Sequence, residues 1–121
     1  HVPAVTDLSE SIAAVSFPPR VEADTPAVAD FLAVLPHVHS VRRTGSTALN
    51  LAWLACGRLH VFWARRIACW DAAAGFLIAQ EAGATLRGFQ SDQEPVPLED
   101  PAFLVTSTPE LFDAVKPLLR R

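Results

Sequence analysis

Asp71 is the acidic residue whose sequence context is best suited to chemistry. It lies in the stretch CWDAAAGFLIAQEAGA, Cys69 to Ala84, between a tryptophan and a long apolar helix pattern. An aspartate at a helix start usually acts as a cap, because its carboxylate accepts hydrogen bonds from free backbone amides and meets the positive end of the helix dipole. It is also an oxygen ligand of the kind that Mg2+ prefers, but a lone carboxylate is a poor magnesium site. On these residues alone, the cap is the favoured interpretation.

A second polar stretch, RRTGSTALN, covers Arg42 to Asn50. Gly45 permits a tight turn, and the backbone amides of Ser46 and Thr47 would point out of a helix N-terminus. Such a turn suits a phosphate or a hydroxyl-rich ligand. The alternative is that Ser46 or Thr47 simply caps the helix, and this stretch alone favours the cap.

The histidines and cysteines indicate no further site. His37 and His39 flank a predicted helix end and His60 opens a predicted strand, so we expect surface or cap roles. Cys56 and Cys69 lie in apolar surroundings without metal-ligand spacing, which predicts buried free thiols in a reducing cytoplasm.

These residues lie in a chain that alternates between short apolar runs and helix patterns. The predicted strands are 11–17, 40–43, 58–64, 84–89 and 102–107, and the predicted helices are 26–35, 46–56, 71–83 and 109–121. This order predicts a single α/β domain over residues 1–121, a layered sandwich with a mixed, largely parallel sheet and flanking helices. Ligands of such sheets gather where strands end and the following helices begin, and both polar stretches lie at such junctions.

Two of the predicted helices have apolar residues that recur at helical spacing, as is typical of an amphipathic helix. In the first helix these residues are Val28, Phe31, Leu32 and Leu35, which fall on one face. In the second helix the residues at helical spacing are Leu49, Ala52, Trp53 and Cys56.

The composition limits the class of protein. Hydrophobic residues make up 50% of the 121 residues and mean hydropathy is +0.25, yet every apolar run is shorter than the roughly 20 residues of a membrane span. We interpret the excess as a core plus a face that covers a partner or second domain; an alanine-rich composition is the alternative.

The net charge of −3 and the scattered arginines argue against nucleic-acid polymers and acidic membranes as partners. A start at His1, without a signal-peptide pattern, suggests part of a longer chain.

The ordered motifs resemble the C-terminal half of the inositol monophosphatase family. The resemblance rests on RRTGSTALNLAWLACGRLHVFW followed by CWDAAAGFLIAQEAGATL, with SESIAAVSFPP before them and FLVTSTPELFDAVKPLL after them. It covers nearly all of the chain from about Leu8 onward. One departure is Ala84, which stands where the family has a second glycine.

The resemblance changes the interpretation of Asp71. It implies that Asp71 is a Mg2+ ligand that helps place the attacking water, and that Gly45, Ser46 and Thr47 contact the substrate. The implied reaction is hydrolysis of a small sugar, inositol or nucleotide phosphate by a metal-activated water. The resemblance also implies a homodimeric enzyme, and we expect it to be bacterial and cytoplasmic.

Two departures limit this function. The family's other metal ligands lie in an upstream half that these 121 residues lack, so we expect this chain alone to be inactive. Ala64 stands where the family often has a glutamate that binds a sugar hydroxyl, which argues against specificity for inositol phosphate. Arg65 and Arg66 suggest a more anionic substrate, although a solvated loop explains them slightly better. The alternative function is a non-catalytic half-domain that acts as a binding or dimerisation module.

Overall fold

The computed structural model describes residues 5–15, 26–43, 46–64, 69–87 and 103–119. The 3-10 helices are η1 (Leu8–Glu10), η2 (Leu35–His37) and η3 (Lys116–Leu118). The α-helices are α1 (Pro26–Val34), α2 (Thr47–Ala55), α3 (Cys69–Glu81) and α4 (Pro109–Val115). The strands are β1 (Ile12–Val15), β2 (Ser40–Arg42), β3 (Val61–Ala64), β4 (Thr85–Arg87) and β5 (Phe103–Thr106). The predicted loop SDQEPVPLED lies outside the described residues.

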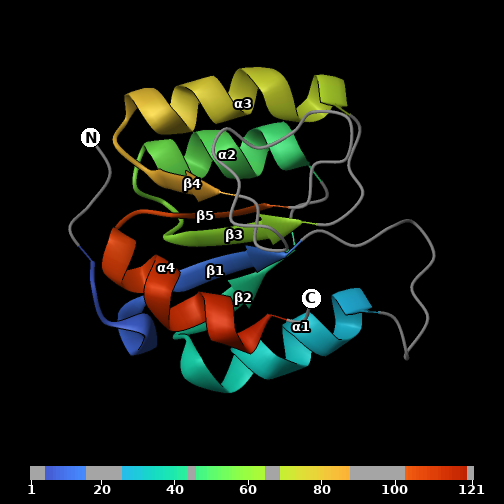
Figure 1. Cartoon of the computed structure of the whole chain (residues 1–121), viewed down its shortest axis with the longest axis vertical. Coiled ribbons are helices and arrows are strands. Elements are labelled where there is room, and N and C mark those ends of the chain that lie inside the picture. Colours follow the sequence, from blue (N-terminus) through green and yellow to red (C-terminus); the bar gives the residue numbers. More distant parts are fainter. Residues whose placement is uncertain (1–4, 16–25, 44–45, 65–68, 88–102, 120–121) are drawn as a thin grey trace.

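These strands form one mixed sheet in the order β2-β1-β3-β5-β4 (Figure 1). β1 is parallel to both β2 and β3, with Ala14 opposite Arg42 on one side and Phe62 on the other. β5 is antiparallel to β3 and β4, its Val105 lying opposite Phe62 and Leu86. The predicted α/β class, with a mixed and largely parallel sheet, is therefore confirmed.

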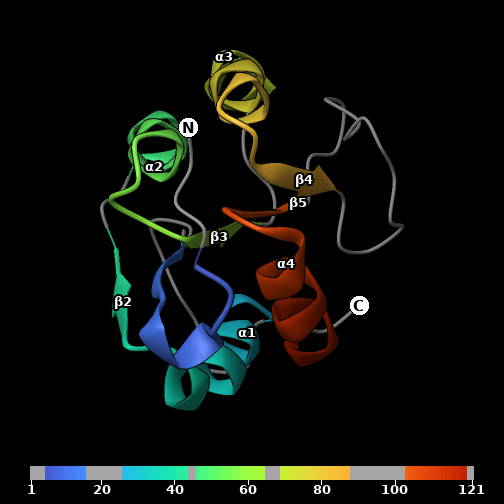
Figure 2. The ribbon, with the colours of Figure 1, turned by 90° about the vertical axis from the view of Figure 1, so that its left-hand side faces the viewer.

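Helices cover both faces of the sheet, so the molecule has three layers. Figure 2 shows α2 and α3 on one face and α1 and α4 on the other. Side chains alternate along the fully buried strand β3: Phe62 and Ala64 join the core under α2 and α3, and Val61 and Trp63 join the core under α1 and α4. A strand buried on both faces is expected to be apolar throughout, as VFWA is.

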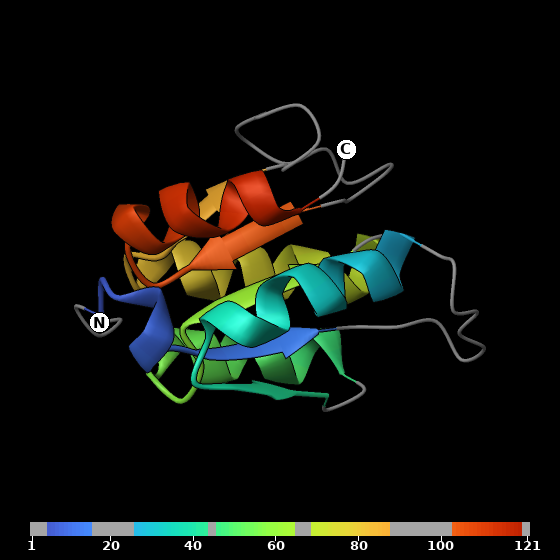
Figure 3. The ribbon, with the colours of Figure 1, turned by 90° about the horizontal axis from the view of Figure 1, so that it is seen from below.

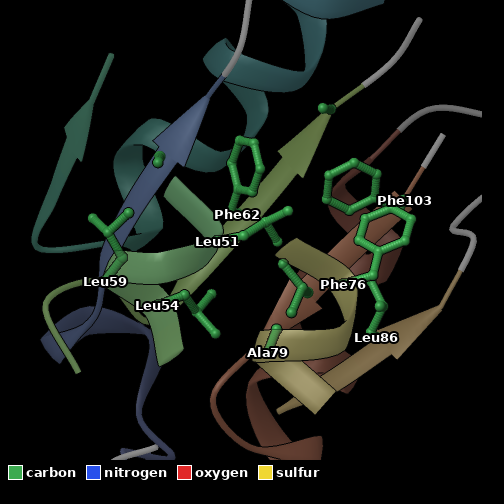
Figure 4. Packing of buried hydrophobic residues seen from close by; sticks show 11 residues of the cluster. Leu51, Leu54, Leu59, Phe62, Phe76, Ala79, Leu86 and Phe103 are labelled. Atoms are coloured by element: carbon green, nitrogen blue, oxygen red, sulfur yellow. The ribbon is translucent and has the colours of Figure 1, made fainter. Parts of the chain in front are cut away.

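The core between the sheet and α2 and α3 is built around aromatic rings (Figure 4). Phe103 makes edge-to-face contacts with Phe62 and Phe76, at centroid distances of 5.4 and 4.7 Å. Above them α2 and α3 approach closely at Gly75, where a Cβ would lie 2.9 Å from Leu51 Cβ. This close contact between the helices therefore requires a glycine at position 75.

The core on the opposite face is mainly aliphatic. Its buried members include Val34, Trp63, Leu104, Leu111 and Val115. Val5 and Leu8 also pack against this cluster, so the segment leading into β1 approaches the sheet on the α1 and α4 side.

The apolar residues named for the first two helices are buried only in part. Phe31 and Trp53 pack against the two cores, but other members of each set do not. Leu32 of α1 and Leu35, the first residue of η2, are 59% and 43% exposed, whereas Asp30 and Val34 are buried. In α2, Leu49 and Cys56 are exposed, and Leu51 and Leu54 are buried. Apolar residues lie on more than one side of these helices, so their spacing does not show which side meets the sheet. The expectation of a buried thiol is therefore wrong for Cys56; the side chain of Cys69 lies outside the described residues.

Local helix signals were more accurate. Ser46 is the N-cap of α2 and Thr108 is the N-cap of α4, each accepting a hydrogen bond from the amide three residues later. Within the described residues, no helix combines the length and apolarity needed to cross a bilayer.

Candidate functional site

The candidate site lies at the edge of the sheet where the parallel strands β1, β2 and β3 end. α2 follows β2 and α3 follows β3, and both helices return toward the strand starts. Their N-termini therefore lie at one edge, as the colour gradients of the two neighbouring helices show in Figure 1. This arrangement brings together the two polar junctions that the sequence separates by about twenty residues.

The start of α2 is held by its own cap. Ser46 Oγ accepts a hydrogen bond of 3.2 Å from the Leu49 amide, and the Ser46 carbonyl accepts one of 3.0 Å from the Asn50 amide. Ser46 therefore has the cap role that the sequence alone favoured. Thr47, the first helical residue, is buried. Gly45 lies outside the described residues, so the predicted substrate contacts of this turn stay a prediction.

The start of α3 lies two residues earlier than predicted, at Cys69. Asp71 is therefore in the first helical turn rather than before it. The backbone of Asp71 is described but its side chain is not, so its role as a metal ligand also stays a prediction.

The packing of the two helices places position 71 opposite Thr47. α2 and α3 meet where Gly75 lies against Leu51. Position 71 is four residues before Gly75, and Thr47 is four residues before Leu51. Because residues i and i+4 share one face of a helix, positions 47 and 71 lie on the facing sides of α2 and α3, one turn nearer the edge.

The electrostatics of this edge favour an anion. The first amides of a helix have no partner within the helix, and the helix dipole adds a partial positive charge at the same end. Here two such ends lie side by side, and α1 begins at the same edge on the other face. A phosphate group matches this environment, with the hydroxyl of Thr47 as an additional polar group.

The described residues do not by themselves form a metal site. No group of three or more His, Cys, Asp or Glu side chains among them could hold a metal ion. Asp71 would supply at most one carboxylate, which is too few ligands for the octahedral oxygen site that Mg2+ requires. Any metal held here would need further ligands from beyond the described residues.

Ala64 ends β3 at the same edge and is 1% exposed. Its methyl group belongs to the core under α2 and α3 and brings no hydrogen-bonding group to the edge. Arg65 and Arg66, which follow it, lie outside the described residues.

His60, at the opposite edge of the sheet, has a structural role that its sequence context did not indicate. His60 Nδ1 accepts a 2.9 Å hydrogen bond from the Ile12 amide, and its own amide donates to the Ile12 carbonyl at 2.8 Å. Burial lowers the pKa of His60. One sequence feature could have predicted this burial. His60 comes directly before an all-apolar strand, and a residue in that position is expected to have a half-buried side chain. His60 is half-buried and has a structural role that the expected surface or cap role did not specify, whereas His37 and His39 are exposed as predicted.

Comparison with known proteins gives consistent matches. The profile of the inositol monophosphatase family matches residues 1–120. An inositol-1-monophosphatase of Mycobacterium leprae is 36% identical over 118 residues, covering 98% of this chain and 40% of the relative. A Nus factor SuhB of Xylella fastidiosa is 36% identical over 90 residues, covering 74% of this chain and 33% of the relative.

Comparison with solved structures identifies the same family. The structure of an inositol monophosphatase from Anabaena (Nostoc) sp. PCC 7120 superposes with a TM-score of 0.84 at 30% identity, covering 97% of this chain and 46% of that one. The chain thus spans less than half the length of these relatives.

Proposed function

Because this chain belongs to the inositol monophosphatase family, we propose that it contributes one part of the active site of a metal-dependent phosphomonoesterase. The substrate class is a small sugar, inositol or nucleotide phosphate. The observation that carries the proposal is the pairing of the α2 and α3 N-termini at the sheet edge, with position 71 facing Thr47.

Each junction has its own role in the proposal. The Gly45–Thr47 turn binds the substrate through backbone amides at the start of α2 and the Thr47 hydroxyl. Asp71 supplies one ligand to Mg2+ from the first turn of α3. When bound, the metal would lower the pKa of a water and stabilise charge on the phosphate.

The proposal requires more polypeptide than these 121 residues. One carboxylate does not hold a catalytic metal, and family members are generally metal-dependent, so the other ligands must come from an N-terminal metal-binding half. The length of the relatives supports this, since the match covers 40% of the Mycobacterium leprae protein. The 121-residue chain by itself is then inactive. A bacterial, cytoplasmic homodimer completes the proposal, and the bacterial relatives support the first of these properties.

The test compares two aspartates in the complete gene product. Asp71→Asn removes the proposed ligand, and the matched control Asp113→Asn changes an exposed aspartate of α4. Phosphate release from inositol 1-phosphate and from 2′-AMP is measured across a Mg2+ titration. Since a lost metal ligand costs several kcal/mol of transition-state stabilisation, we expect kcat to fall by about 100-fold or more for Asp71→Asn and to change less than about twofold for Asp113→Asn. Unchanged activity and Mg2+ dependence in Asp71→Asn would refute the role.

A second candidate is the non-catalytic binding or dimerisation module. It is supported by the Xylella fastidiosa relative, whose name is that of a Nus factor rather than an enzyme. This alternative predicts that the unmodified gene product releases no more phosphate than Asp71→Asn does, on either substrate.

A further inference from the structure

We propose that His60 is a pH-dependent latch: its side chain fastens the start of β1 to the start of β3 at neutral pH and releases it when the imidazole is protonated. The latch lies at the sheet edge opposite the candidate site, and it does not depend on the proposed function. Figure 3 shows η1 at this edge, where β1 begins. Release opens this part of the chain locally, while the rest of the domain stays folded.

The latch is a hydrogen bond between backbone and side chain. The Ile12 amide donates to His60 Nδ1 at 2.9 Å, and the His60 amide donates to the Ile12 carbonyl at 2.8 Å. Ile12 is the first residue of β1, and His60 directly precedes β3. One residue beside β3 therefore binds both backbone polar groups at the start of β1.

The imidazole of His60 takes the place of a backbone acceptor. In a continued parallel ladder, the Ile12 amide would donate to a carbonyl of the chain that precedes His60. Here that chain turns away, since the amides of Arg58 and Leu59 both bond to the Trp53 carbonyl in the last turn of α2. A buried amide without an acceptor costs free energy, and the side chain of His60 supplies the acceptor instead.

Protonation of His60 removes this acceptor. The lone pair on Nδ1 receives the Ile12 N–H, whereas an imidazolium carries a proton on both ring nitrogens, so that two donors would face each other. Burial lowers the pKa of His60 below its ordinary value of 6.5. The contribution of the bond is therefore complete above pH 6.5 and is lost as the pH falls through the lowered pKa.

Burial, rather than a neighbouring charge, causes this shift in the pKa of His60. β1 and the end of β5 bring no titratable side chain to it. The titratable groups of the other described segments at this edge belong to η1 and its cap, the turns before β2 and after α2, the end of α3 and the start of α4. They are Asp7, Glu10, His39, Cys56, Arg58, Glu81 and Glu110. All of these are exposed, so water and salt screen their charges from His60.

The segment that leads into β1 has a second tie, which does not titrate. Thr108 Oγ1 donates to the Val5 carbonyl at 2.7 Å, and Val5 and Leu8 pack against the core under α1 and α4. Between the two ties, the Ser11 amide and hydroxyl both donate to the Leu8 carbonyl, at 3.1 and 2.7 Å. Protonation of His60 therefore frees the end of the segment next to β1, while Val5 stays bound.

The test is amide hydrogen exchange of the complete gene product, read at single residues by mass spectrometry and corrected for the intrinsic rate at each pH. Between about pH 7.5 and about pH 5, we expect the protection of the Ile12 amide to fall about fivefold or more, the effect of losing one hydrogen bond. At the lower pH, Ile12 should also be at least about tenfold less protected than Val105 in the centre of β5, because the opening is local. Constant protection of Ile12, or equal protection of Ile12 and Val105, overturns the proposal.

Two matched variants separate His60 from its neighbour His39. Asparagine at position 60 keeps an acceptor oxygen but does not titrate, so His60→Asn should abolish the pH dependence of Ile12 protection. His39→Asn removes an exposed histidine and keeps its backbone amide, which donates to the Ser11 carbonyl at 2.9 Å. This control should leave the pH dependence unchanged. The reverse result would assign the effect to His39 and contradict the latch.

A measurement on the unmodified protein covers the case in which His60→Asn does not fold. The slow exchange of the imidazole C2 hydrogen, also followed by mass spectrometry, gives the pKa of His60 in the folded protein. Protection of Ile12 should begin to fall near pH 6.5 and should level off below that measured pKa. A loss of protection that continues at the same slope below the pKa of His60 would show that another group controls the opening.

Discussion

The helix pair α2 and α3 and the helix pair α1 and α4 cover the two faces of one sheet, and they differ in how closely they pack. α2 and α3 approach each other so tightly at Gly75 and Leu51 that no Cβ fits between them. On the other face, Asp30 and Val34 of α1 are buried, whereas Leu32 of α1 and Leu35 of η2 are exposed. The tight contact aligns the helix starts of the candidate site. Exposed large apolar side chains occur on both faces, Leu32 and Leu35 on one and Leu49, Leu77 and Ile78 on the other.

The largest expected effect concerns the aromatic core under α2 and α3. Phe103→Ala removes a fully buried ring in contact with Phe62 and Phe76, and we expect it to lower the free energy of unfolding by about 3–5 kcal/mol. Urea unfolding followed by tryptophan fluorescence measures the change. The exposed control Gln80→Ala should change stability by less than about 0.5 kcal/mol. Similar values for the two variants would mean that this core is not packed as described.

The next effect tests the close helix contact itself. Gly75→Ala places a methyl group against the side chain of Leu51, and we expect a loss of about 1–3 kcal/mol by the same unfolding measurement. Without that contact, alanine would instead stabilise the helix by about 1 kcal/mol. The control is the double variant with Leu51→Ala, which should cost less than the sum of its parts because the two changes share one contact. Strict additivity would show that the helices lie farther apart.

A smaller effect compares the helix caps on the two faces. Thr108 Oγ1 accepts from the Leu111 amide at 3.4 Å and donates to the Val5 carbonyl at 2.7 Å. We expect Thr108→Ala to cost about 1–2 kcal/mol, because it removes both a cap and a tie to the incoming segment. Thr108→Ser keeps the hydroxyl and is the control. If Thr108→Ser lost as much unfolding free energy as Thr108→Ala, the effect would come from the methyl group rather than from the hydroxyl.

The smallest effect is a pH dependence at the far edge of the sheet. Burial lowers the pKa of His60 in the folded state, so the unfolded chain binds more protons between that lowered pKa and the ordinary value of 6.5. The contribution of His60 is therefore complete above pH 6.5 and is lost as the pH falls through the lowered pKa. An asparagine side chain at this position has an acceptor oxygen near the place of Nδ1 but does not titrate. The His60→Asn variant should therefore lose less stability than the unmodified protein when the pH falls from about 7.5 to about 5.5. Parallel pH profiles in urea unfolding would exclude this role.

Much of the fold could be predicted from local sequence signals. Ser46 and Thr108 were predicted as caps because a short hydroxyl side chain before an apolar helix satisfies free amides through contacts within four residues. The order of strands and helices, and the placing of Asp71 and the Gly45–Thr47 turn at one sheet edge, followed from the βα alternation. These features depend on neighbours in sequence, so the chain itself determines them.

The tertiary structure decided the rest. Apolar residues lie on several sides of α1 and α2, and only the position of the sheet determines that Val34 and Leu51 are buried while Leu32 and Leu49 are exposed. His60 became an acceptor for Ile12 because β1 and β3, distant in sequence, lie side by side. Positions 47 and 71 likewise face each other only because α2 and α3 come into contact at Gly75. The sequence by itself determined which elements form, because those interactions are local, although α3 begins two residues earlier than predicted. Which side of each element is covered was decided by packing between distant segments.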